Sequence, residues 1–298
     1  MEINFELYKV FYHVAHHRSF SEAAAQLFIS QSAVSQSIKQ LETLLGSKLF
    51  FRHTKNIQLT KEGEILFRHI EPAFHFIKAG ERGLNAVQSL HSGEIRIGAS
   101  DTICKHYLLP FLKQFNTLYP EIRINVINRT SPSCIDLLQK GIVDLSIINL
   151  PPQVNYKNLT VYQLQKIHDA FVAGNSYLPL KNRCIDPHEL EKYPLLILEA
   201  NTTTRIFFDD FLKKNSLTVQ PEIELGSVDL LVEMAKIGLG ISFVIHEFIA
   251  QELQNGEIFV LHVNADFPAR YIGLVTNDTI PLSVAARRFS ELLGITVV

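Results

Sequence analysis

Residues 20–51 read FSEAAAQLFISQSAVSQSIKQLETLLGSKLFF and have the composition of two short helices joined by a tight turn. The first helix carries three consecutive alanines, which let a neighbouring segment approach closely. We expect Ser21 to cap this helix and Ser30 to cap the second, because a hydroxyl in front of an apolar-periodic run accepts hydrogen bonds from the free amides of the first turn. Between the two helices, Phe28 and Ile29 predict an apolar corner.

The second of these helices has two different faces. One face is apolar, with small or hydrophobic residues at helical spacing: Ala33, Val34, Ile38, Leu41, Leu44 and Leu45. The opposite face carries short, amide or basic side chains: Gln31, Ser32, Ser35, Gln36 and Lys39. Such side chains can reach base edges and phosphates, and a polar helix after a tight turn is typical of a helix that enters a DNA groove. The sequence therefore predicts that these five residues contact DNA.

Over residues 1 to about 62 the chain resembles the winged helix-turn-helix of LysR-type transcriptional regulators. The residues that carry the resemblance stand at fixed spacing: Phe11, Ser19, Phe20, Ala23, Ala24, Leu27, Ser30, Gln31, Ser32, Ala33, Val34, Ser35, Ile38, Leu41, Glu42, Gly46, Leu49, Phe50, Arg52, Leu59, Thr60 and Gly63. A three-helix bundle with no role in DNA binding is the alternative. The resemblance continues more loosely to the C-terminus, and it implies a bacterial DNA-binding regulator controlled by a small molecule.

Two residues of the predicted recognition helix depart from the family pattern. Ser32 stands where proline is usual, and Gln36 stands where arginine is frequent. Glutamine reads adenine edges better than guanine, so we expect a different half-site preference.

A short wing and a long helix follow. Residues 49–60 (LFFRHTKNIQLT) predict two strands around a turn, and this wing completes a DNA-binding domain over 1–62. We expect Arg52 and Lys55 to lie near the phosphate backbone together with Lys39, where contacts give affinity but little sequence choice.

Residues 63–90 predict a linker helix. Its small and hydrophobic residues recur at alternating steps of four and three, as in a coiled-coil seam: Leu66, Ile70, Ala73, Ile77, Gly80, Leu84 and Val87. Pro72 interrupts the pattern, and because proline costs roughly 3 kcal/mol inside a helix we expect a kink. In the LysR family this helix pairs two subunits, so the resemblance implies a homodimer or homotetramer. A helix packed on its own domain is the alternative.

Bulk composition fits a soluble chain of two or three domains. The net charge of −2 conceals an asymmetry, because residues 1–62 hold seven Lys and Arg against five Glu, which leaves −4 on the rest. A basic N-terminal segment followed by an acidic remainder is typical of a DNA-binding domain joined to a sensor domain. The first residues lack the basic start and apolar stretch of a signal peptide, so we expect a cytoplasmic protein.

From residue 91 onward strand and helix patterns alternate, which predicts an α/β effector-binding domain over 91–298 with parallel sheets. We expect two lobes that the chain crosses twice, with lobe I over about 91–163 and 265–298 and lobe II over about 164–264. This organisation resembles the periplasmic-binding-protein-like effector domain of LysR-type regulators.

Polar side chains follow several strands of this domain and precede helices. In two-lobed α/β proteins, ligands bind at such positions, against helix N-termini. In the family, the positions that match Ser100, Thr102, Thr130 and Thr202 commonly contact the effector. With their neighbours they give the candidate effector-binding set: Ser100, Thr102, Thr130, Ser131, Asn149, Thr202 and Thr203. We expect the hydroxyl and free backbone amides at Ser100 to suit an anion, and the whole set to bind a polar, anionic metabolite. Ordinary helix capping is the alternative for each residue.

Arg129 and Arg205 are candidate counterions of the effector, and either could instead be a surface residue.

Other functions have less support. An exported solute-binding protein would need a signal, and an enzyme would need a nucleophile and base or metal ligands, for which no motif is present. We expect no cofactor and no metal, although a histidine-based metal response is conceivable. The partners implied are double-stranded DNA, the effector, a second copy of the chain and, for an activator, RNA polymerase.

The three cysteines form no metal-binding pattern. Cys104 and Cys134 both begin predicted helices near the effector residues, where a helix dipole can lower a thiol pKa and allow redox sensing. Burial as small apolar residues is the alternative that we favour.

Overall fold

The computed structural model describes residues 3–51, 57–88, 93–151 and 156–297, with side chains except at 82–88. These residues divide into two compact units, which are described separately: one is built from the N-terminal residues up to Glu81 and the other essentially from Arg82 onward. Among the described residues, no helix is long and apolar enough to cross a membrane.

The N-terminal unit is a helix-turn-helix with a short wing. Its helices are α1 (Phe5–His17), α2 (Phe20–Leu27) and α3 (Gln31–Leu45), and its antiparallel strands are β1 (Phe50–Phe51) and β2 (Gln58–Leu59). Ser30 caps α3 as predicted, because its hydroxyl accepts the amide of Ala33. The expected cap of α2 was wrong by two residues: Ser19, not Ser21, is the N-cap and accepts the amide of Glu22.

Glu42 fixes α3 to the wing. Its carboxylate is buried and accepts hydrogen bonds from the Leu49 amide at 2.9 Å and from the Lys48 ammonium at 3.0 Å. Around it, the side chains of the three helices and of β1 form one core, whose fully or nearly fully buried members are Phe11, Val14, Ala23, Val34, Ile38, Leu41 and Leu49.

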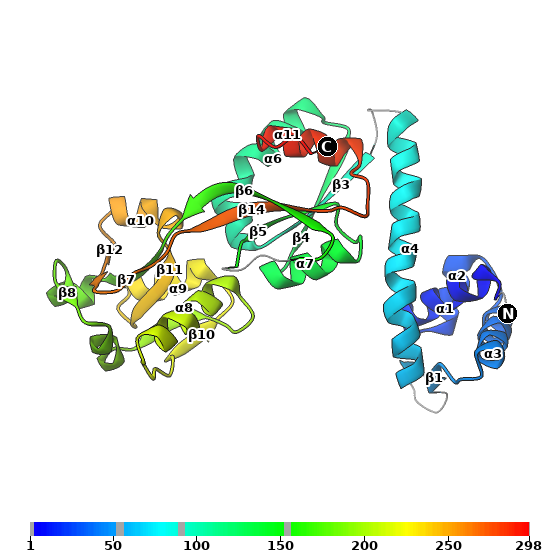
Figure 1. The fold of residues 1–298 in the computed structure, drawn as a ribbon, viewed down its shortest axis with the longest axis horizontal. Coiled ribbons are helices and arrows are strands. Elements are labelled where there is room, and N and C mark those ends of the chain that lie inside the picture. Colours follow the sequence, from blue (N-terminus) through cyan, green and yellow to red (C-terminus); the bar gives the residue numbers. More distant parts are fainter. Residues whose placement is uncertain (1–2, 52–56, 89–92, 152–155, 298) are drawn as a thin grey trace. The chain divides into compact units, whose positions relative to one another are not determined.

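Helix α4 (Lys61–Gln88) runs without interruption through Pro72. The expected kink is absent, since Figure 1 shows no sharp bend. Packing on both sides of the proline explains this. Before Pro72, Phe67 packs into the core of the N-terminal unit. After Pro72, the ring of Phe74 stacks on Tyr12 of α1, with the two ring centroids 4.5 Å apart. The first half of α4 therefore packs on its own domain, whereas Ile77 remains 44% exposed.

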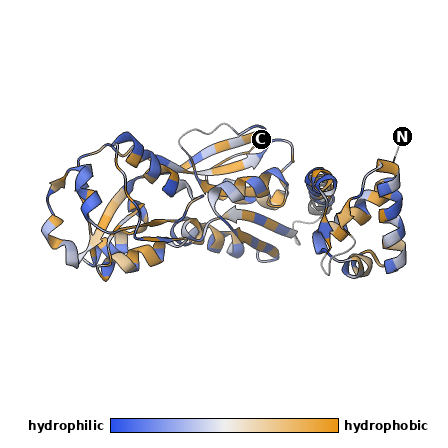
Figure 2. Cartoon of the chain, turned by 90° about the horizontal axis from the view of Figure 1, so that it is seen from below, coloured by the Kyte–Doolittle hydropathy of each residue, from blue (hydrophilic) through white to orange (hydrophobic). Residues whose placement is uncertain are grey.

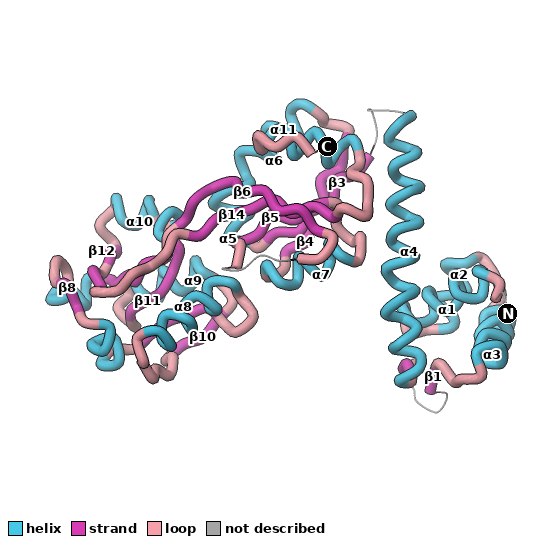
Figure 3. Tube along the Cα trace, in the orientation of Figure 1, coloured by secondary structure: helices cyan, strands magenta, loops and turns pink. Residues whose placement is uncertain are grey.

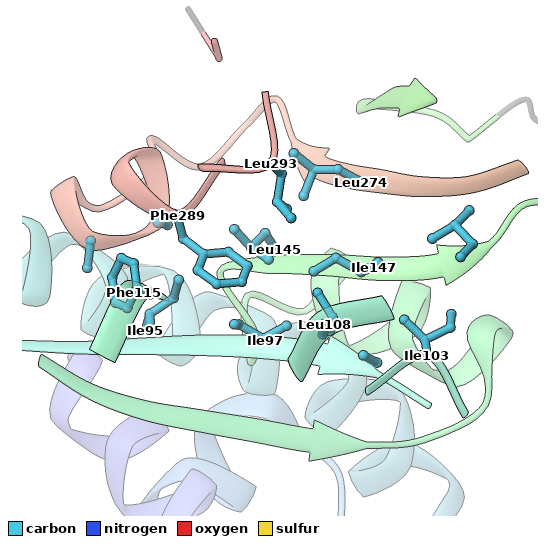
Figure 4. Close-up of a cluster of buried hydrophobic side chains, with 14 of the residues drawn as sticks. Ile95, Ile97, Ile103, Leu108, Phe115, Leu145, Ile147, Leu274, Phe289 and Leu293 are labelled. Carbon is cyan, nitrogen blue, oxygen red and sulfur yellow. The ribbon is translucent and has the colours of Figure 1, made fainter. Parts of the chain in front are cut away.

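The second unit has two lobes, each with a five-stranded sheet (Figure 3). Lobe I contains β3 (Gly93–Ala99), β4 (Ile122–Asn128), β5 (Leu145–Asn149), β6 (Leu159–Ile167) and β14 (Arg270–Asn277), in the order β4-β3-β5-β14-β6. Its helices are α5 (Asp101–Ile103), a π-helical turn (Cys104–Leu108), α6 (Leu109–Leu118), α7 (Ser131–Gln139) and α11 (Val284–Leu292). Figure 4 shows its apolar core, where Phe115 of α6 and Phe289 of α11 meet with ring centroids 5.3 Å apart.

Lobe II contains β7 (Asp169–Gly174), β9 (Leu195–Leu198), β10 (Ile223–Leu225), β11 (Ile241–Ile245) and β12 (Ile258–Val260), in the order β10-β9-β11-β7-β12. A small parallel pair joins β8 (Cys184–Ile185) to β13 (His262–Val263). The helices are α8 (Thr203–Lys214), α9 (Val228–Lys236) and α10 (Ala250–Gln254), with 3-10 turns over Asn175–Leu180, Pro187–Lys192 and His246–Phe248. In Figure 2 the strands carry much of the hydrophobic colour of the lobes, as expected for sheets covered by helices.

The expectation of parallel sheets was wrong in part, because both sheets are mixed. In lobe I, β3, β4 and β5 are parallel, but β14 pairs antiparallel with β5 and β6. The reason is the second crossing: β14 returns from lobe II and enters the sheet from the opposite end. Figure 1 shows β6 and β14 side by side along this connection.

A buried ion pair joins the two places where the chain passes between the lobes, which are called the two crossings below. Asp169 begins β7 after the first crossing, and Arg270 begins β14 after the second. The guanidinium donates from Nε to the Asp169 carboxylate at 2.6 Å and from Nη2 to its other oxygen, and both side chains are almost fully buried.

Candidate DNA-binding surface and effector pocket

The polar face of α3 is exposed along its length. Val34, Ile38 and Leu41 are buried against α1 and α2, and this packing holds the opposite face outward. The five side chains predicted to contact DNA are all exposed on that face: Gln31, Ser32, Ser35, Gln36 and Lys39. The hydroxyl of Ser32 lies 2.8 Å from that of the cap Ser30, so the N-terminal turn of α3 is already ordered.

Two further predicted DNA contacts, Arg52 and Lys55, lie outside the described residues. The strands on either side of them pair Phe50 with Leu59 and Phe51 with Gln58, as a wing requires.

The turn before α3 contains a residue whose exposure the sequence did not indicate. Phe28 is 94% exposed and has a left-handed backbone with φ of 55°. Its amide closes α2 by donating to Ala24 and Ala25. Phe28 therefore does not form the expected apolar corner, and its side chain is exposed to solvent in the turn before α3.

A cavity of about 290 Å³ lies between lobe I and lobe II. All seven predicted effector-binding residues line it: Ser100, Thr102, Thr130, Ser131, Asn149, Thr202 and Thr203. They come from the ends of β3, β4 and β5 in lobe I and from the start of α8 in lobe II.

The N-terminus of α5 is closed to ligands, contrary to expectation. The amide of Asp101 donates to Oδ1 of Asn128, that of Thr102 to the Asp101 carboxylate, and that of Ile103 to the Ser100 hydroxyl. Each backbone amide of this first turn therefore donates to a side-chain oxygen. The free amides predicted at Ser100 are not available to an anion.

The N-termini of α7 and α8 are open. In α7, Ser131 and Ser133 have amides with no acceptor among the described residues, and the Ser131 hydroxyl accepts the Asn149 amide at 3.2 Å. In α8, the cap Thr202 accepts the Arg205 amide, whereas the amides of Thr203 and Thr204 have no acceptor in the described part of the chain. Free amides at a helix N-terminus favour an acceptor or an anion.

The charged groups of the cavity differ from the expected set. Arg129 lines it, with Nη1 donating to the Asn128 carbonyl at 2.7 Å. Arg205 does not line it, because its guanidinium is held by Asp209 at 2.8 Å and by Glu224 at 3.0 Å. Arg205 is therefore not a counterion of a ligand in this cavity.

Sequence reasoning also missed part of the lining: Asn128, Glu199, Thr204, Gly226, Val228 and Ile245. Glu199 and Gly226 follow strands of lobe II directly, so the rule that ligands bind at strand ends could have found them. A Cβ at Gly226 would lie 2.9 Å from the Glu199 carboxylate, so a larger residue there would displace the end of this side chain.

Burial opposes thiolate formation at Cys104 and Cys134. Cys134 is fully buried, and burial raises the pKa of its thiol to about 11. Burial, helped by the nearby Asp101 charge, also raises the pKa of Cys104. The lowering of thiol pKa values considered from sequence is therefore wrong for both, and Cys184 is the exposed one.

Comparison with known families agrees with this architecture. Residues 5–64 match the bacterial regulatory helix-turn-helix of the LysR family, and residues 88–295 match the LysR substrate-binding domain. The chain belongs to the LysR family. It is a DNA-binding transcription regulator with an effector-binding domain, and not an enzyme.

Individual proteins are also similar over most of the chain. The transcriptional regulator CfxR of Cupriavidus necator is 30% identical over 256 residues, which cover 86% of this chain and 80% of CfxR. A probable RuBisCO transcriptional regulator of Cyanidium caldarium is 28% identical over 94% of this chain and 90% of its own. A full-length OxyR variant from Pseudomonas aeruginosa has the same fold, with a TM-score of 0.72 at 20% identity over 99% of this chain and 96% of its own.

Proposed function

We propose that this LysR-family regulator switches its DNA binding in response to a small, polar, anionic metabolite bound in the cavity between the lobes. The observation that carries the proposal is that two open helix N-termini, of α7 in lobe I and of α8 in lobe II, line one cavity. An acceptor bound by both would change the angle between the lobes, and a ligand shifts a conformational equilibrium by its preference for one state.

In this proposal the chain is divided into a DNA-binding domain over 1–62, a linker helix over 63–90 and an effector domain over 91–298. Gln31, Ser32, Ser35 and Gln36 read bases, while Lys39, Arg52 and Lys55 hold phosphates. The linker helix and the effector domain pair subunits into a dimer or tetramer in the cytoplasm, and an activating complex also contacts RNA polymerase.

The DNA part is tested by selecting a preferred duplex from a random pool with the full-length protein. Gln36→Ala should then lose about 1–3 kcal/mol of binding on the selected duplex and little on a scrambled one. Gln251→Ala on the exposed surface of α10 is the control. Equal loss on both duplexes, or none, would show that Gln36 does not read bases.

The effector part is tested by thermal shift of the full chain against a metabolite panel of amino acids, hydroxy acids, di- and tricarboxylates and phosphate esters. A binding compound raises the melting temperature in proportion to ln(1 + [L]/Kd). The effect should weaken in Thr203→Pro, because proline removes one free amide at the first position of α8, where it is tolerated. The same compound should change affinity for the selected duplex. A compound that binds but leaves DNA affinity unchanged would contradict the switch.

A further inference from the structure

We infer that the cavity takes a zwitterion of the α-amino acid type with an apolar side chain, rather than a di- or tricarboxylate or a phosphate ester. This inference rests on the proposed effector pocket. It keeps the anionic group proposed there, as a carboxylate, and adds an ammonium and an apolar side chain, so the ligand as a whole carries no net charge.

The acceptor end of such a ligand has a defined place. Helices α7 and α8 are nine and twelve residues long, and each has a first residue, Ser131 or Thr203, that lines the cavity and whose amide has no acceptor among the described residues. A single carboxylate offers two oxygens, one for each helix. The third helix at the cavity, α5, has used its amides internally and offers no place for a second anionic group.

Asn149 lines the same cavity and carries a buried acceptor that has no donor among the described residues. Asn149 is only 8% exposed, and within the described part of the chain its buried side-chain oxygen Oδ1 accepts no hydrogen bond. An unpaired buried acceptor is costly, and native proteins keep one where a ligand or water supplies the donor. A carboxylate cannot donate, whereas an ammonium group can.

The charged side chains that line the cavity also favour a ligand with an ammonium group. One guanidinium, Arg129, stands against two carboxylates, Asp101 and Glu199, so the side chains of the cavity sum to one negative charge. Glu199 is exposed and has no ion-pair partner among the described residues. A ligand with two or three negative charges would meet repulsion here, whereas an ammonium would be attracted.

The remaining lining is apolar. Leu198, Val228 and Ile245 form part of the wall, and the volume of about 290 Å³ leaves room for a side chain beyond the ammonium and carboxylate. Pockets of this kind bind an apolar body and orient it with a few polar groups.

The experiment is a calorimetric titration of the full-length protein with matched probes. L-leucine, L-methionine and L-phenylalanine are each compared with the 2-hydroxy acid that replaces the ammonium by a hydroxyl, and with the amine that lacks the carboxylate. At least one amino acid should bind, and its two analogues should bind at least about ten-fold more weakly, because each loses a charge-assisted hydrogen bond. Succinate, citrate and 3-phosphoglycerate should not bind.

Two variants connect the preference to the residues. Glu199→Gln and Asn149→Leu should each weaken the amino acid about ten-fold while the 2-hydroxy acid changes little, and Asn255→Leu at the exposed end of α10 should change neither. Because Glu199 is exposed and holds no other side chain, its variant tests the idea even if Asn149→Leu fails to fold.

The possible results separate this inference from the proposed function. An amino acid and its hydroxy acid that bind equally, or a dicarboxylate or phosphate ester whose binding is weakened by Thr203→Pro, would overturn the zwitterion and leave the proposed effector pocket standing. No binding by any probe class would count against both.

Discussion

Oγ1 of Thr204 accepts a hydrogen bond from Nη2 of Arg270 at 3.2 Å, and both side chains are buried. Thr204 lines the cavity, and Arg270 begins the strand by which the chain returns to lobe I. The same guanidinium is paired with Asp169 at the other crossing. The wall of the cavity is thus connected to both crossings by one buried polar network. In the proposed switch, a ligand that moves the start of α8 would therefore act on both crossings.

Thr204→Val tests this connection, because it removes the acceptor and keeps the shape. We expect a loss of about 1 kcal/mol in the free energy of unfolding, since a buried guanidinium N–H loses its partner. We also expect a smaller effect of ligand on DNA affinity, with the coupling free energy falling below the usual 1–3 kcal/mol while ligand affinity stays within a few-fold. Thr218→Val on the exposed surface of lobe II is the matched control. Unchanged coupling in Thr204→Val would contradict a role for this contact.

The buried pair itself gives a second prediction. Arg270→Met should cost about 3–5 kcal/mol in chemical denaturation, because it leaves the Asp169 carboxylate buried and unpaired. Combining it with Asp169→Leu should recover most of that loss, since two apolar residues replace two charges. A double variant as unstable as the single one would show that the pair is needed for packing and not only for charge balance.

How much the sequence could predict depends on how local each feature is. The cap at Ser30 and the two faces of α3 follow from residues within one or two turns, and both were predicted. The closure of α5 depends on Asn128, which lies 27 residues from the Asp101 amide it accepts. The Asp169–Arg270 pair joins residues 101 positions apart, and the antiparallel course of β14 follows from the same return. No local pattern contains such contacts. The seven effector residues could be placed at the cavity because strand ends gather at one edge of a sheet, but the sequence could not show which of their amides remain free.

Phe28 gives a third prediction, about stability. A large side chain with φ of 55° is strained, and at 94% exposure its ring gains little from burial. Phe28→Asn should therefore raise the free energy of unfolding by about 0.5–1 kcal/mol, because asparagine adopts this conformation more readily. Phe28→Ala keeps the strain and should gain less. A destabilised Phe28→Asn would mean that the ring packs on the domain after all.

The thiols give the last prediction. With a pKa of about 11, the thiol of Cys134 is ionised in roughly one thousandth of the protein molecules at pH 8. The residue is also fully buried. Cys104 is partly buried and its pKa is raised as well. A thiol reagent such as DTNB should therefore react quickly with one cysteine per native chain, and Cys184→Ser should abolish that fast phase. The other two thiols should react only as the protein unfolds. A fast reaction that persists in Cys184→Ser would show that the lobes open far enough to expose Cys104 or Cys134, and would bring redox sensing back into consideration.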